Sequence, residues 1–118
     1  MYKKIFCNHP IIKTFNTSCK FKILLVCGTH GDEPAGKLAI DNYNFNDLPF
    51  YITTVIVNPC GLQKNSRNNP FNNLDINRQY LQNDPHNLQI EHLVHHHDII
   101  IDFHEGYDYH IVNPSSIG

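Results

Sequence analysis

The chain has 118 residues, a length that predicts one small domain. Its net charge is −2 at pH 7 and its few lysines and arginines form no run, so the composition argues against a nucleic-acid partner. No apolar run approaches the roughly 20 residues of a membrane span, and the N-terminus lacks the apolar core of a signal peptide. We therefore expect a cytoplasmic protein with neither nucleic acid nor a membrane as a partner.

The first predicted elements are a strand and a helix. Residues 1–20 are mixed and predict at most a short strand and a loop. Residues 21–28 (FKILLVCG) form a nearly continuous run of Ile, Leu and Val, which is typical of a strand buried on both faces. Residues 33–45 (EPAGKLAIDNYNF) predict a helix whose inner face we expect Leu38 and Ala39 to supply.

The remaining elements alternate in the same way. Residues 50–58 (FYITTVIVN) predict a second buried strand rich in β-branched side chains, and residues 59–77 predict a long polar loop. A helix over 85–97, a third buried strand over 98–103 (DIIIDF) and a further strand over 107–112 follow. This order predicts an α/β domain spanning residues 1–118, with a mostly parallel or mixed sheet flanked by helices.

The four cysteines form no metal-binding pattern. No C-x-x-C pair is present, which argues against a zinc ribbon, and Cys27 lies in an apolar run where we expect it to be buried.

Two histidines follow predicted buried strands. His30 comes just after the strand over 21–28, and His104 just after the strand over 98–103. If these strands are parallel, both histidines reach the same edge of the sheet, where ligands of open α/β sheets bind. Glu33 lies close enough to point the same way. Two imidazoles and one carboxylate with a fourth position open are the ligand set of a catalytic zinc.

Ordinary structural roles compete with this interpretation. Glu33 could be a carboxylate that favours the positive end of a helix dipole, and His104 could be a histidine that simply ends a strand. H-x-x-E is also a common spacing. The joint placement of the two histidines at strand ends, each near a glycine (Gly31 and Gly106), favours the metal site.

The polar loop offers groups that could hold a carboxylate. Arg67 and Arg78 can each make two parallel hydrogen bonds to such a group, and Asn77 can donate one. Asp75 could accept a hydrogen bond from the far nitrogen of a zinc-bound imidazole and fix its orientation. The competing interpretation is a solvated, asparagine-rich loop.

Four motifs in order, GTHGDE, VNPCGLQKNSR, LDINR and DFHEG, carry a family resemblance. Over residues 22–118 the chain resembles the succinylglutamate desuccinylase/aspartoacylase family, which is related to zinc carboxypeptidases. The resemblance implies a zinc-carboxypeptidase-like fold and hydrolysis of an amide bond, typically in an N-acyl amino acid, by a zinc-activated water. It implies one Zn²⁺ per chain, bound by His30, Glu33 and His104.

The same resemblance assigns roles to the polar loop. It implies that Arg67 is catalytic and helps to polarise the scissile carbonyl. Arg67, Asn77 and Arg78 would bind the carboxylate-bearing small-molecule substrate. Asp75 would orient His30 from behind the metal.

The chain departs from the family where the general base should be. Family members are longer and place a glutamate base well beyond the second zinc histidine, whereas this chain reaches Gly118 soon after His104. Glu91 belongs to a predicted helix with no reason to approach the metal. Glu105 would face the opposite side from His104 on a continued strand, and would approach the metal only if Gly106 bends the chain.

The missing base leaves alternatives open. We favour the chain as the N-terminal, truncated portion of the family fold, and therefore expect marginal stability. It could also be a remnant that binds zinc or a ligand without catalysis, or its site could be completed by self-association or by a separate C-terminal segment. The leading predicted function is a zinc-dependent deacylase acting on carbon–nitrogen bonds. A metallocarboxypeptidase acting on peptides is the further alternative.

The run HLVHHHD contains a second histidine pattern. His92 and His96 are four residues apart on a predicted helix and could chelate a metal from one face. The competing interpretation is a favourable interaction of histidines with the negative end of the helix dipole, with only adventitious binding of nickel or zinc.

Overall fold

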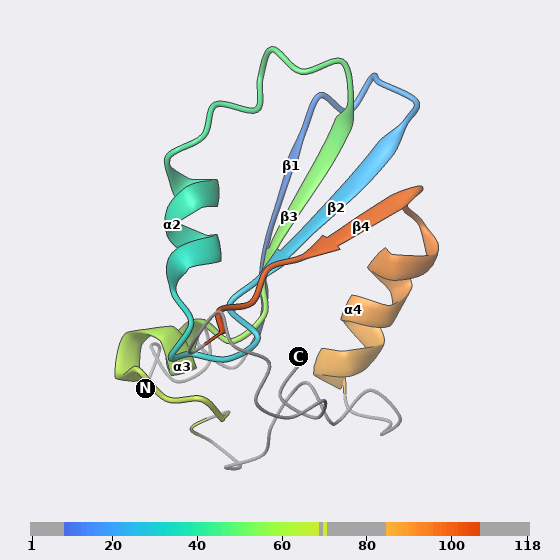
Figure 1. The fold of residues 1–118 in the computed structure, drawn as a ribbon. Coiled ribbons are helices and arrows are strands. Elements are labelled where there is room, and N and C mark those ends of the chain that lie inside the picture. The colour runs from blue at the N-terminus through green and yellow to red at the C-terminus, as the bar shows by residue number, and fades with distance from the viewer. Residues whose placement is uncertain (1–8, 69, 71–84, 107–118) are drawn as a thin grey trace.

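The computed structural model describes residues 9–68, 70 and 85–106, except for the side chains of 85–88. Its strands are β1 (Ile11–Phe15), β2 (Lys22–Cys27), β3 (Tyr51–Ile56) and β4 (Ile99–Asp102). They form one mixed sheet in the order β1-β3-β2-β4 (Figure 1). β2 pairs in parallel with both β3 and β4, and β1 pairs antiparallel with β3. The α/β class and the mixed sheet are confirmed.

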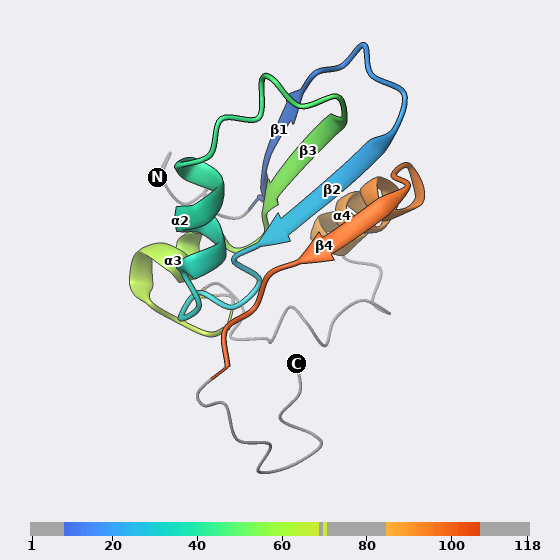
Figure 2. The same ribbon diagram turned by 45° about the horizontal axis from the view of Figure 1, so that its top comes forward.

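Helices cover both faces of this sheet. They are α2 (Ala35–Asp41), α3 (Pro59–Lys64) and α4 (Pro85–His95). Figure 2 shows α4 behind β2 and β4, with α2 to the left of the strands, and Ile40 of α2 and Ile90 of α4 belong to different apolar clusters. No helix among the described residues combines the length and the apolar character needed to cross a bilayer.

The core is divided by the sheet into two apolar clusters. On the α4 face, Leu24 and Val26 of β2 pack with Val55, Val57 and Ile90. On the α2 face the cluster consists of Leu25, Phe45 and Ile52, with Ile23 and Ile40 packed against it. Successive residues of β2 therefore face opposite clusters, as the pleat of a strand requires. The prediction that this strand is buried on both faces is confirmed.

Helix α2 is shorter than predicted and faces the sheet differently. It ends at Asp41 rather than Phe45, and Leu38 is 57% exposed while Ala39 is also exposed, so the predicted inner face was wrong. Gly36 and Ile40, one helical turn apart, face the sheet instead. A Cβ on Gly36 would lie 2.7 Å from Phe103 Cβ and 3.0 Å from Cys27 Cβ, so glycine permits this close approach.

The predicted polar loop over 59–77 begins with a short helix, α3, which corrects that prediction. The Asn58 side chain accepts a hydrogen bond of 3.0 Å from the backbone N–H of Gly61, and Pro59 occupies the first turn. The helix ends at Lys64 and is capped by Asn65, which adopts a left-handed conformation with φ 52°. Residues 71–77 of this predicted loop lie outside the described residues.

The predicted helix over 85–97 and the predicted strand over 98–103 are present, but the strand is not buried. The helix over 85–97 ends at His95 as α4, and β4 follows. All residues of β4 are exposed, so the prediction of a third buried strand was wrong in this respect. Within the described residues β4 lies at the edge of the sheet and pairs only with β2. The predicted strand over 107–112 lies outside the described residues.

Candidate metal centre

The parallel pairing of β2 and β4 brings the segments that follow them to one edge of the sheet. In their register Leu24 pairs with Ile100 and Val26 with Asp102. His30 and His104 follow these strands, and their ring centroids are 5.3 Å apart. The structure therefore brings together two of the side chains that the sequence singled out as metal ligands.

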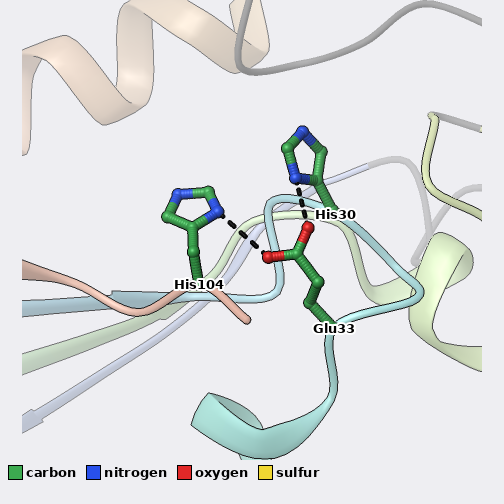
Figure 3. Close-up of side chains that lie close together, drawn as sticks. All are labelled: His30, Glu33 and His104. Carbon is green, nitrogen blue, oxygen red and sulfur yellow. Dashed lines mark hydrogen bonds and ion pairs between the residues drawn. The ribbon is translucent and has the colours of Figure 1, made fainter. Parts of the chain in front are cut away.

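The carboxylate of Glu33 lies between the two imidazoles (Figure 3). Its Oε2 is 2.5 Å from Nδ1 of His30, and its Oε1 is 3.2 Å from Nδ1 of His104. The backbone N–H of Glu105 also donates to Oε1 over 2.7 Å. His30, Glu33 and His104, hereafter the strand-end triad, each offer one ligand atom, and these atoms lie within 4.8 Å of one another.

The turn after β2 fixes the first two members of the triad. Gly31 packs against the backbone of Gly61 and Ser66, where an added Cβ would lie only 2.1–2.3 Å from backbone atoms. This close approach requires glycine. The backbone N–H of Glu33 donates to the carbonyl of His30 over 3.2 Å, which folds the glutamate back toward the histidine. His30 is 3% exposed and therefore has little room to change position.

Glu33 is held in its charged form by its neighbours. Burial alone would raise the pKa of Glu33, but the Glu105 N–H, the hydrogen bond to His30 and the nearby imidazoles lower it more. The net pKa of Glu33 therefore lies below its ordinary range. An ionised carboxylate next to two imidazole nitrogens is a favourable environment for a divalent cation.

Asp102 is a site residue that the sequence analysis did not identify. Its Oδ2 lies 3.0 Å from Nε2 of His104, the ring nitrogen that faces away from Glu33. If a metal takes Nδ1 of His104, the Nε2–H can donate to Asp102, as the outer nitrogen of a metal-bound histidine usually does to a carboxylate or carbonyl. The D-x-H spacing of IDFH was the available signal, because alternate residues of an extended chain face the same side.

The donor set of the triad fits zinc. Two imidazole nitrogens and one carboxylate leave a coordination position for water or substrate, which is the composition of catalytic rather than structural zinc sites. Among the side chains that the structure describes (9–68, 70 and 89–106), no other group of three His, Cys, Asp or Glu lies close enough to hold a metal ion.

An open pocket of about 180 Å³ adjoins the triad. It is lined by Asp32, Glu33, Glu105 and Gly106. Oδ1 of Asp32 is buried and has no hydrogen-bond partner among the described residues, although no role at the site was predicted for Asp32 from the sequence. The carboxylates of Asp32 and Glu105 are therefore candidates for proton transfer at the site.

Of the other residues predicted for the site, only Arg67 lies within the described part of the chain. Nη1 of Arg67 lies 3.6 Å from Oε2 of Glu33, so Arg67 adjoins the triad and is partly exposed. Glu91, for which no role at the metal was predicted, lies on α4, where its Oε1 is 3.8 Å from Nε2 of His95. Asp75, Asn77 and Arg78 lie outside the described residues, and their roles stay predictions.

Comparisons with known proteins add no relatives: no family model, curated protein or solved structure matches the chain. The family resemblance therefore rests on the four sequence motifs, and the geometry of the triad stands independently of it.

Proposed function

We propose that this chain is a zinc-dependent hydrolase that cleaves an amide bond in a small carboxylate-bearing substrate, such as an N-acyl amino acid. We further propose that the chain belongs to the succinylglutamate desuccinylase/aspartoacylase family. Its fold would then resemble the N-terminal portion of a zinc carboxypeptidase. The observation that carries the proposal is the convergence of His30 Nδ1 and His104 Nδ1 on the carboxylate of Glu33.

Zinc at this position would polarise a substrate carbonyl and lower the pKa of a water molecule. The protein's contribution is to hold three ligands with little freedom. His30 is buried, Glu33 is anchored by the N–H of Glu105, and His104 is oriented by Asp102. A preorganised ligand set of this kind avoids the cost of ordering flexible side chains when the metal binds.

Arg67 is the described residue best suited to contact the substrate. Its guanidinium adjoins Glu33 yet remains partly exposed, so it can reach a group that enters from solvent. A planar guanidinium can bind a carboxylate or stabilise a developing oxyanion. We assign Arg67 to the scissile carbonyl and the substrate carboxylate, with Asn77 and Arg78 as further carboxylate ligands.

Proton transfer needs a base, and the pocket offers two carboxylates. Asp32 has a buried oxygen with no hydrogen-bond partner in the described part of the chain, and Glu105 lines the same pocket. If neither accepts a proton from water, the alternative function is binding of zinc or a ligand without catalysis. The openness of the pocket also leaves a metallocarboxypeptidase acting on peptides as a candidate, because a peptide needs an open cleft.

Zinc stoichiometry under chelator competition tests the metal centre. We expect the wild type to retain one tightly bound zinc, and His30→Ala and His104→Ala to lose it. His95→Ala, which removes an exposed histidine from α4, is the matched control and should keep it. If both triad variants retain tight zinc, the proposed centre is wrong.

Hydrolysis assays then separate the functional alternatives. The zinc-loaded protein should cleave N-acyl amino acids faster than C-terminal peptide bonds, and Arg67→Ala should lose most of that activity. Asp32→Asn and Glu105→Gln, each checked for retained zinc, identify the base. Tight zinc without hydrolysis of either substrate class would favour the non-catalytic alternative.

A further inference from the structure

A second histidine pair lies at the other end of the sheet from the strand-end triad. The C-terminal end of α4 leads into the start of β4, whereas the triad follows the opposite ends of β2 and β4 (Figure 1). His92 and His96, hereafter the α4 histidine pair, are both exposed and one helical turn apart. Their ring centroids are 4.1 Å apart, and the ring planes are inclined by 33°. His92 lies in the last turn of α4 and His96 directly follows the helix, so the rings lie side by side at its C-terminal end.

A hydrogen bond determines which nitrogen of His96 is available. Nδ1 of His96 lies 2.8 Å from the backbone carbonyl of His92. A carbonyl can only accept, so Nδ1–H donates and the lone pair of the neutral ring is on Nε2. Donation of the other ring N–H to a backbone carbonyl is the usual arrangement of a histidine that binds a metal, because it fixes both the tautomer and the ring orientation.

The surroundings of the pair favour a cation. Both residues lie near the C-terminus of α4, where the partial negative charge of the last carbonyls attracts positive charge. Glu91 precedes His92 directly and adds a carboxylate, whose Oε1 lies 3.8 Å from His95. The sequence of α4, PHNLQIEHLVH, contains neither lysine nor arginine.

The neighbouring histidine His97 serves the fold instead. Its Nδ1 donates to the carbonyl of Leu93 over 2.6 Å, and the hydroxyl of Thr53 donates to its Nε2 over 2.6 Å. Both ring nitrogens are thus used, and the contact ties the end of α4 to β3. The four histidines of the run therefore divide into the structural His97, the exposed pair His92 and His96, and His95, which lies near Glu91.

We propose that His92 and His96 form a second, solvent-exposed metal site. This site binds a first-row divalent cation through the Nε2 atoms of both histidines. His92 and His96 have the four-residue spacing at which two histidines bind zinc in known helical sites. Imidazole suits Cu²⁺, Ni²⁺ and Zn²⁺, and the general order of affinities puts Cu²⁺ above the other two. Water completes the coordination. The proposal does not depend on the hydrolase function.

A Ni²⁺ titration of the full-length, tag-free chain tests the site in a His30→Ala/His104→Ala background, which removes the strand-end site. We expect one equivalent of Ni²⁺ to bind. Loss of a residue that only hydrogen-bonds to a metal ligand weakens metal affinity by ~10–100-fold. Adding His92→Ala or His96→Ala removes a ligand itself, so the Ni²⁺ affinity should fall by more than that. Adding His95→Ala, the matched control, should change it by less than about twofold, as expected for a side chain outside the ligand set. Absence of binding, or equal losses in all three variants, would overturn the proposal.

A second measurement uses the wild-type chain and so does not depend on how the variants fold. Histidines are modified with diethyl pyrocarbonate with and without Ni²⁺, and each site is quantified by peptide mass spectrometry. Bound metal should protect His92 and His96, because their Nε2 lone pairs are then occupied, and leave His95 as reactive as before. Unchanged modification of His92 and His96 in the presence of Ni²⁺, or equal protection of His95, contradicts the proposed site.

Discussion

The adjacent strands β2 and β4 have equally apolar sequences but different environments. Leu24, Leu25 and Val26 of β2 are 0–8% exposed, whereas Ile99–Ile101 of β4 are 42–45% exposed. β2 pairs on both sides, and β4 pairs only with β2 within the described residues. The difference shows that burial of an apolar strand depends on its place in the strand order, which the strand's own residues do not encode.

This contrast extends to the candidate metal centre, because each strand leads to a ligand. His30, after β2, is almost fully buried, whereas His104, after β4, is partly exposed. Glu33 contacts both imidazoles and thereby joins the well-packed strand to the exposed one. A metal bound at the triad would therefore stabilise the position of β4, since a ligand that binds only the folded state raises the free energy of unfolding.

The largest expected effect compares the paired residues Leu24 and Ile100. Leu24→Ala removes a fully buried side chain and should lower the free energy of unfolding by ~2–5 kcal/mol. Ile100→Ala removes a side chain that is already 43% exposed, and should cost about 1 kcal/mol or less. Urea unfolding followed by circular dichroism measures both values. Equal losses would mean that β4 is as well packed as β2, contrary to the comparison.

The next effect tests the close approach of α2 to both strands at Gly36. In an exposed helix Gly→Ala stabilises by about 1 kcal/mol. Here the added Cβ would meet Phe103 and Cys27, so Gly36→Ala should instead destabilise by ~1–3 kcal/mol. Leu38→Ala, on the exposed side of the same helix, is the control and should stay within about 0.5 kcal/mol of wild type. Stabilisation by Gly36→Ala would show that the helix lies further from the sheet.

The sequence predicts elements well where a local pattern determines them. The runs 21–28 and 50–58 are apolar and β-branched enough to identify β2 and β3. α3 was not predicted because its determinants, the Asn58 cap and Pro59, lie among polar residues that resemble a loop. The exposure of β4 was not predictable from residues 98–103, because it follows from pairings between distant strands.

The site divides in the same way. The approach of His30, Glu33 and His104 follows from their positions after parallel strands, so the sequence was sufficient to propose it. Asp102 was overlooked because it belongs to the strand pattern, and only the geometry shows its contact with His104. A side chain whose contacts depend on a neighbouring element, rather than on a periodic sequence pattern, can be assigned to the site only from the structure.

A smaller expected effect concerns Asp102, the last residue of the exposed strand β4. If Asp102 orients His104 toward a metal, Asp102→Asn should weaken zinc binding by ~10–100-fold, with the lower end expected because an amide oxygen can still accept a hydrogen bond. The control is Asp98→Asn at the opposite end of β4, where Asp98 accepts from the backbone N–H of Lys22 over 2.8 Å. Competitive zinc titration should show a loss for Asp102→Asn only. Similar losses for both variants would indicate a general loosening of β4.

The smallest expected effect is a pH-dependent change in the free energy of unfolding caused by Cys27, at the end of β2. This change is absent at neutral pH. Burial, followed by the nearby charge of Asp41, raises the pKa of the Cys27 thiol from its ordinary 9.0 to about 12. Below about pH 9 the thiol is protonated in both the folded and the unfolded states, and the shift has no effect on stability. As the pH rises from there toward 12 the unfolded state loses its proton first, so the free energy of unfolding should fall. The difference between wild type and Cys27→Ala in urea unfolding isolates this contribution from other groups that titrate in that range. A difference that stays constant from pH 8 to 11 would contradict a buried thiol at this end of β2.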